Sequence, residues 1–190
     1  MLCAKRDESK KNLVLVFGNP SPHSVKEAIM FSYEGKLYKT HRVWKVLQDT
    51  GIINIPQELC SQSLDDYKEK GIKRNDLVRD GLISDKFNLS LFSYFTLPSA
   101  SSDLKWSGVA GLKKLLGRKA WEKFKIIEHD RFLAHLTFLP LNTKILVFQK
   151  DVYDNIIENS NTLDITLLSP TRLWYSQKVK NAFAQTINEA

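Results

Sequence analysis

Two short apolar segments that each run into a polar loop containing proline constrain the fold most strongly. Residues 13–17 (LVLVF) lead into 18–22 (GNPSP), and residues 163–168 (LDITLL) lead into 169–174 (SPTRLW). Apolar, β-rich runs followed directly by turn residues predict buried strands. Because ligands of open α/β sheets collect at the carboxyl ends of strands, the two loops could form opposite walls of one pocket.

Helical and strand-like patterns alternate along much of the remaining chain. Apolar spacing predicts helices over 41–52, 108–124, 151–158 and 176–187, and a shorter one over 65–70. Further segments are a strand at 144–148, a candidate strand within 126–139, a turn with a short extended or helical piece at 71–78, and a long irregular excursion at 82–107. Alternating strands and helices imply right-handed parallel crossovers. We therefore expect an α/β fold, three-layer α/β/α, with a central, mainly parallel, four-stranded twisted sheet.

The length and composition suit a single domain spanning 1–190. The chain has 190 residues, of which 43% are hydrophobic, and a domain of this size buries roughly 70% of its unfolded surface. Residues 1–11 are charged and are expected to be flexible. No apolar run approaches the ~20 residues that cross a bilayer, and the run after the charged start is too short for a signal-peptide core. We expect a monomeric, cytoplasmic, nucleoid-associated protein without membrane contact.

Metal-binding patterns are missing from the sequence, whereas basic residues are abundant. Cys3 and Cys60 are far apart, and the histidines follow no ligand spacing, so we expect neither a metal nor a cofactor.

The net charge of +7 points to a polyanionic partner, because Lys and Arg release counterions from phosphate backbones. The predicted helix 108–124 carries Lys113, Lys114, Arg118, Lys119 and Lys123. Such a basic face either contacts nucleic acid or is simply solvated.

Asn19-Pro20 follows the strand predicted at 13–17, Phe31 comes twelve positions later, and three further motifs follow at 41–47, 71–79 and 169–173. Taken in this order, these segments resemble the uracil-DNA glycosylase superfamily, and most closely its mismatch-specific uracil and thymine-DNA glycosylase branch. Asn19-Pro20 matches the strand-end Asn-Pro motif, and Phe31 lies at the spacing of the phenylalanine on which those enzymes stack the extruded base. Residues 41–47 (HRVWKVL) resemble the family's Asn-Arg-Phe-Trp-Lys helix start, and 71–79 (GIKRNDLVR) its Gly-Ile loop. Residues 169–173 (SPTRL) occupy the place of the second motif, from which the family inserts a side chain into the duplex.

The resemblance implies a DNA glycosylase that flips a deaminated base, uracil or hypoxanthine, out of DNA and hydrolyses its N-glycosidic bond. Asn19 would position the attacking water, since an amide does not titrate, and Asp76 would supplement the stabilisation of the leaving base. Phe31 would stack on the base. The other residues assigned to the base are Gly18, Pro20, Ser21 and Ser169, and those assigned to DNA are Pro170, Thr171, Arg172, Leu173 as the wedge, and Trp174.

Each of these residues also has a plainer interpretation. Asn19-Pro20 is a common turn, Phe31 and Leu173 could be ordinary core residues, and Asp76 could cap a helix. Ser21 and Ser169 replace residues that relatives carry, which favours an alternative in which the fold binds DNA or a modified base without cleaving it. A nucleotide enzyme with a phosphate cradle after the first strand is a third hypothesis, although the chain lacks the Gly-x-x-x-x-Gly-Lys pattern.

Overall fold

The computed structural model describes residues 1–32, 39–60, 63–99, 105–159, 165–167, 181 and 185. The strands are β1 (Lys11–Phe17), β2 (Phe87–Ser93), β3 (Lys144–Val147) and β4 (Ile165–Leu167). The helices are α1 (Pro22–Glu27), α2 (Arg42–Asp49), α3 (Tyr67–Arg79), α4 (Gly108–Leu136) and α5 (Lys150–Asn159), with a 3-10 turn, η2, at Gln57–Leu59.

The strands pair in the order β2-β1-β3-β4, and all three pairings are parallel. In the centre, Leu15 of β1 lies opposite Leu91 of β2 on one side and Leu146 of β3 on the other. The chain therefore moves from β1 to one neighbour and later returns to the opposite side. This reversal creates a topological switch point at the carboxyl ends of β1 and β3, where ligands of such sheets bind. A mixed α/β fold with a parallel sheet is thus confirmed.

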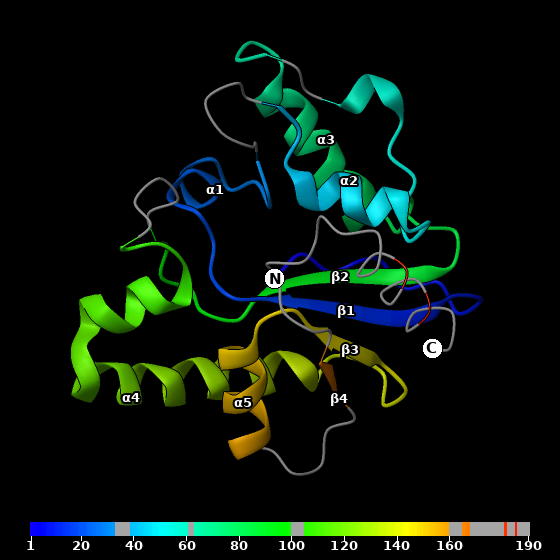
Figure 1. The fold of residues 1–190 in the computed structure, drawn as a ribbon. Helices are drawn as coiled ribbons and strands as arrows, with labels where there is room; N and C mark the ends of the chain where they lie inside the picture. The colour runs from blue at the N-terminus through cyan, green and yellow to red at the C-terminus, as the bar shows by residue number, and fades with distance from the viewer. Residues whose placement is uncertain are drawn as a thin grey trace.

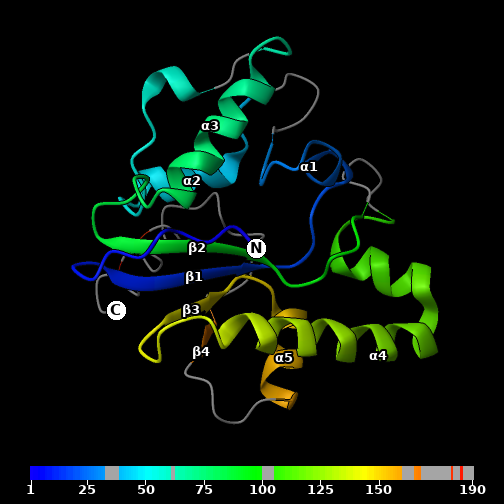
Figure 2. The same ribbon diagram turned by 180° about the vertical axis from the view of Figure 1, so that it is seen from behind.

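Alternate residues of β1 enter two apolar clusters on opposite faces of the sheet. Leu13 and Leu15 pack with Trp44 of α2 and Val78 of α3. The intervening residues Val14 and Val16 pack on the other face. The second cluster there also includes Phe132 of α4 and Val152 and Ile156 of α5. Figures 1 and 2 accordingly show α2 and α3 on one side of the sheet and α4 and α5 on the other. Each large side chain buried in this way contributes about 1.5–3 kcal/mol.

Three segments differ from the sequence prediction. The predicted irregular excursion 82–107 contains β2, which pairs with β1 along its whole length. The candidate strand at 126–139 is instead the second half of α4, and residues 71–78 lie inside α3 rather than in a turn. β2 was difficult to recognise because its polar residues Asn88 and Ser90 are buried rather than exposed. Asn88 is satisfied by accepting from the backbone N–H of Asp7 at 3.0 Å and donating to the carbonyl of Asp7 at 2.8 Å.

Residues 1–11, expected to be flexible, are held against the domain. Leu2 is buried and forms an antiparallel bridge with Leu91, with backbone hydrogen bonds of 2.9 and 2.8 Å in the two directions. The N–H of Lys5 donates to the carbonyl of Arg79 at the end of α3. The bridge covers part of the outer edge of β2, which would otherwise expose unpaired backbone groups.

Candidate functional site

The loops that follow β1, β2 and β3 meet at the switch point. Gly18, directly after β1, accepts a hydrogen bond from the N–H of Phe95 at 2.8 Å, which joins it to the segment after β2. A Cβ at Gly18 would overlap the carboxamide of Gln149, which follows β3, and would touch Val109 of α4. Glycine at this position therefore leaves room for the Gln149 side chain, which would have to move if a Cβ were present.

Asn19 is held by its amide nitrogen. Nδ2 donates to Ser99 Oγ at 2.8 Å and to the carbonyl of Pro20 at 3.2 Å. A backbone carbonyl can only accept, so the NH2 group faces Pro20 and the orientation of the amide is defined. No hydrogen bond from the described residues reaches Oδ1. Asn19 therefore presents a fixed acceptor at the carboxyl end of β1.

Ser99 is the partner that the sequence interpretation missed. It is buried, and its N–H also donates to the carbonyl of Pro20 at 3.4 Å, so it contacts the Asn19 loop twice. We expected the serine-rich stretch around it to be an irregular surface segment. The signal available in the sequence was weak, because it consisted only of a serine closely following a Phe- and Leu-rich stretch.

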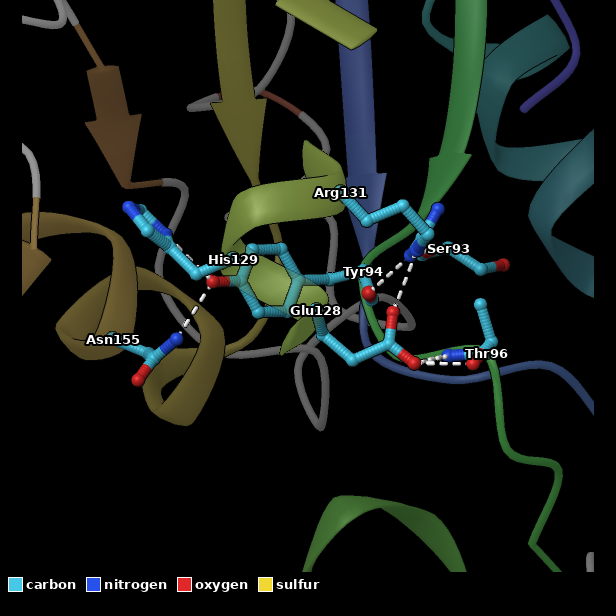
Figure 3. A network of polar contacts seen from close by, with 7 residues as sticks. All are labelled: Ser93, Tyr94, Thr96, Glu128, His129, Arg131 and Asn155. Atoms are coloured by element: carbon cyan, nitrogen blue, oxygen red, sulfur yellow. Dashed lines mark hydrogen bonds and ion pairs between the residues drawn. The ribbon is translucent and has the colours of Figure 1, made fainter. Parts of the chain in front are cut away.

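A buried ion pair anchors the segment that carries Ser99. Glu128 of α4 accepts from both the N–H and the hydroxyl of Thr96, and from Arg131 Nε at 2.6 Å. Arg131 in turn donates to the carbonyls of Ser93 and Tyr94 (Figure 3). Because Glu128 is almost fully buried, losing one partner would leave an unpaired charge inside the protein. The pair thus fixes the chain where it leaves β2.

The hydroxyl of Tyr94 connects this segment to α4 and α5. It lies 3.0 Å from Nδ1 of His129 and accepts from Nδ2 of Asn155 at 2.6 Å (Figure 3). Burial raises the pKa of Tyr94 and lowers that of His129. Both side chains are therefore neutral at physiological pH. This group of residues stabilises the packing of the segment and does not act as a general acid–base pair.

Phe31 lies at the same end of β1 as Asn19. Its backbone has a φ of 49°, and its carbonyl accepts from the indole N–H of Trp44 at 3.0 Å. Its half-buried ring packs edge-on against Phe17, the last residue of β1, with 4.7 Å between ring centroids. Phe17 is stacked on Phe148, which follows β3. The aromatic cluster therefore lies on the β3 side of β1.

Two basic side chains, the half-buried His41 and the buried Arg74, lie in the same layer as Phe31. The ring of His41 is 5.1 Å from that of Phe31, and its Nδ1 accepts from the N–H of Val43 at the start of α2. Burial, together with the charges of Arg42 and Arg74, lowers the pKa of His41 to about 4. Arg74 is fully buried and donates to the carbonyls of Leu59 and Ser32, while burial lowers its pKa to about 10.

Asp76 and Ser21 occupy positions with evident structural roles. Asp76 lies on the exposed side of α3, where it pairs with Arg79 at 2.7 Å. Because residues 71–78 are helical, no loop carries this carboxylate toward Asn19, and its predicted catalytic role gains no support from this position. Ser21 caps α1 by accepting from the N–H of Ser24 at 3.1 Å.

The opposite wall of the predicted pocket lies outside the described residues. It comprises Ser169, Pro170, Thr171, Arg172, Leu173 and Trp174. β4 ends at Leu167, shortly before this segment, and is paired with β3. Of the predicted helix 176–187, the structure describes Asn181 and Gln185, and both are helical.

A basic surface covers α4 near the kink at Gly117. Lys113, Lys114, Arg118, Lys119 and Lys123 are exposed there, and we refer to these five residues as the basic α4 surface. Glu122, the acidic residue among them, pairs with Lys125 at 2.9 Å. In both ribbon views the first half of α4 lies beyond the carboxyl ends of β1 and β2, on the same side as α1 (Figures 1 and 2). Positive charge is therefore concentrated close to the candidate site.

Comparisons with known proteins give no family for this chain. No protein-family model matches it, and no curated protein matches it either. Within the ranges that the structure describes, no helix is long and apolar enough to span a bilayer. The same residues contain no group of three or more His, Cys, Asp or Glu side chains that could hold a metal ion.

Proposed function

We propose that this protein is a monofunctional DNA glycosylase that acts on a deaminated base, uracil or hypoxanthine. The observation that carries the proposal is the fixed acceptor of Asn19 at the switch point, with the ring of Phe31 at the same strand end. The strand pairings and the two apolar clusters support the architecture this requires, a three-layer α/β/α fold with a four-stranded sheet.

The chemistry assigned to Asn19 follows from its hydrogen bonds. With both amide protons directed to Ser99 and Pro20, Oδ1 remains to accept a proton of a water molecule and to hold it near the sugar C1′. The amide does not act as a base, so rate enhancement depends on positioning and on stabilising the charge of the departing base. Ser99 is then a positioning residue, because its hydroxyl holds the amide of Asn19 in one orientation.

Recognition of the substrate rests on two further features. Phe31, whose half-buried ring packs against Phe17, His41 and Trp44, is assigned to stack on the extruded base, and stacking of this kind contributes about 1–3 kcal/mol per base. The basic α4 surface provides exposed cations for the phosphate backbone next to the same strand ends. The segment 169–174 is assigned as the opposite wall, with Leu173 filling the gap in the duplex.

The direct test uses duplex DNA that contains one modified base. Excess protein is incubated with duplexes containing uracil, hypoxanthine or a mismatched thymine, and alkali then cleaves the strand wherever a base has been removed. We expect strand breaks with at least one of these substrates. Intact DNA in all three reactions, with a commercial glycosylase cleaving the same duplexes, would refute the proposal.

The assignment of Asn19 and Ser99 is tested with three variants. We expect Asn19→Ala to lower the cleavage rate at least about tenfold, and Ser99→Ala to lower it by a smaller factor, because a mispositioned water loses much of the benefit of orientation. DNA affinity should persist in both variants. Asn54→Ala, which removes an exposed amide, is the matched control and should cleave like the wild type. An unchanged rate in Asn19→Ala would remove this residue from the mechanism.

One observation favours the alternative of a protein that binds DNA or a modified base without cleaving it. The Gln149 carboxamide fills the space against Gly18, between the ends of β1 and β3. In that case DNA binding would weaken linearly with the logarithm of salt concentration, and no base would be released. Product formation by the wild type, abolished in Asn19→Ala, would exclude this alternative.

A further inference from the structure

A separate hollow of about 200 Å3 lies beside the loop after β1, on the side of β2. Pro20, Ile29 and Met30 form apolar parts of its wall. Its polar parts include Ser24 of α1, Ser93 at the end of β2, and Asn75 and Arg79 on α3, and the N-terminal Met1 also lines it. Phe31 does not line this hollow and packs instead against Phe17, which is stacked on Phe148, so the hollow is distinct from the surface assigned to the extruded base.

Asn75 supplies the wall of this hollow with a buried amide that lacks hydrogen-bond partners among the described residues. Its side chain is 97% buried (3% exposed), and its Oδ1 is buried without a hydrogen-bond partner among the described residues. Its Nδ2 also has no hydrogen bond to any of them. An amide removed from water without a partner is unfavourable. Because Oδ1 has almost no accessible surface, a complementary group in the hollow would gain both hydrogen bonds once the side chains that cover this atom shift aside.

The chemistry of the wall limits the ligand. An amide presents an acceptor and a donor side by side, the same arrangement through which Asn binds two adjacent atoms on the edge of adenine. A ring with an N–H next to a C=O complements it. Pockets for drug-sized ligands measure about 300–1,000 Å3, so a hollow of about 200 Å3 suits one small heterocycle.

We propose that this hollow binds a free nucleobase-type lactam such as uracil or hypoxanthine, through paired hydrogen bonds to Asn75. The ring would pack against Ile29 and Met30. Arg79, which is paired with Asp76 at the rim, stays outside the pair of hydrogen bonds. The inference concerns equilibrium binding of a free base with no bond broken, so it does not depend on glycosylase activity.

The test follows the fluorine NMR signal of 5-fluorouracil as the full-length protein is added, with unlabelled uracil as competitor. We expect saturable line broadening that excess uracil reverses. Asn75→Leu, which has a similar shape without the amide, should weaken binding at least about tenfold. Lys73→Gln, at an exposed position of α3 that does not line the hollow, is the matched control and should bind like the wild type.

Two further variants separate this site from the candidate active site and from misfolding. Asn19→Ala should retain 5-fluorouracil binding even if it abolishes base excision. Val25→Trp, at a half-exposed wall position, should block the hollow without disturbing the core. The proposal is wrong if the wild type does not bind the probe at millimolar concentration. It is equally wrong if Asn19→Ala loses binding while folded Asn75→Leu and Val25→Trp keep it.

Discussion

His41 is a residue whose protonation opposes the folded state. Its neutral ring accepts from the N–H of Val43 to cap α2, and its pKa is lowered from 6.5 to about 4 by burial and by the nearby arginines. Between these two values the unfolded chain binds a proton that the folded protein does not. The contribution of neutral His41 to the unfolding free energy is therefore fully present above pH 6.5. It falls by about 2–3 kcal/mol as the pH drops toward 4.

The His41→Asn variant tests this link between charge and stability. Asparagine can cap the helix but does not titrate, so we expect its unfolding free energy to change less between pH 6.5 and 4 than that of the wild type. Urea unfolding at a series of pH values measures the difference. Some pH dependence will remain, because burial also lowers the pKa of His23, His129 and His135. Parallel curves for variant and wild type would show that His41 does not contribute.

At the residue scale, the sequence identified the Asn19 loop but not its partners. A polar loop after an apolar strand is a local pattern, and β1 does end where that pattern predicts. Ser99 and Gln149 reach the loop only through the folding of distant segments, and neither has a local signature. Phe31 illustrates a third case, because its half-buried ring is compatible with both the packing and the stacking interpretation.

At the scale of elements, Gly117 divides α4 into two helical halves. Its φ of 69° and ψ of 168° lie in a region that is essentially restricted to glycine, and no atom would crowd a Cβ there. We therefore expect Gly117→Ala to reduce the unfolding free energy by about 1–3 kcal/mol, although alanine normally stabilises a helix relative to glycine. Urea unfolding measures the change.

The control for this prediction is Leu115→Ala, at an exposed position two residues away. Its effect should stay within about 0.5 kcal/mol, as is usual for surface substitutions. A Gly117→Ala variant that is more stable than the wild type would mean that the helix is continuous through this position.

Prediction of the elements succeeded where side chains alternate plainly between core and solvent. Residues 108–124 and 151–158 were predicted as helices and form parts of α4 and α5. The prediction failed for β2, whose buried Asn88 is hydrogen-bonded by Asp7 and Asn12, far away in sequence. It also failed for 126–139, where the helical periodicity continues beyond the kink and Phe132 enters the core.

At the scale of the whole molecule, strand order determines which loops can cooperate. The order β2-β1-β3-β4 brings the loop after β1 beside those after β2 and β3. Sequence alone predicted parallel pairing but could not identify β2, so it could not place Ser99 beside Asn19. The pairing of β4 with β3 places the end of β4 at the same edge of the sheet, which is the geometrical requirement for the proposed second wall.

The distribution of charge gives a prediction for the molecule as a whole. The five cations of the basic α4 surface have no ion-pair partners among the described residues, whereas Lys45 and Lys73 on the opposite layer pair with Asp49 and Glu69. If DNA lies against α4, each cation that meets a phosphate releases about one counterion. The double variant Lys114→Gln/Lys119→Gln should then reduce the slope of log affinity against log salt by about 2.

Fluorescence anisotropy of a labelled duplex between about 50 and 200 mM salt measures this slope. Lys45→Gln/Lys73→Gln is the matched control, because it removes the same net charge from the layer of α2 and α3. If both double variants lowered the slope equally, binding would depend on net charge rather than on a defined face. If only the α4 variant lowered the slope, the duplex would lie across the carboxyl ends of the strands, where Asn19 and Phe31 lie. This conclusion would hold whether or not the bound base is cleaved.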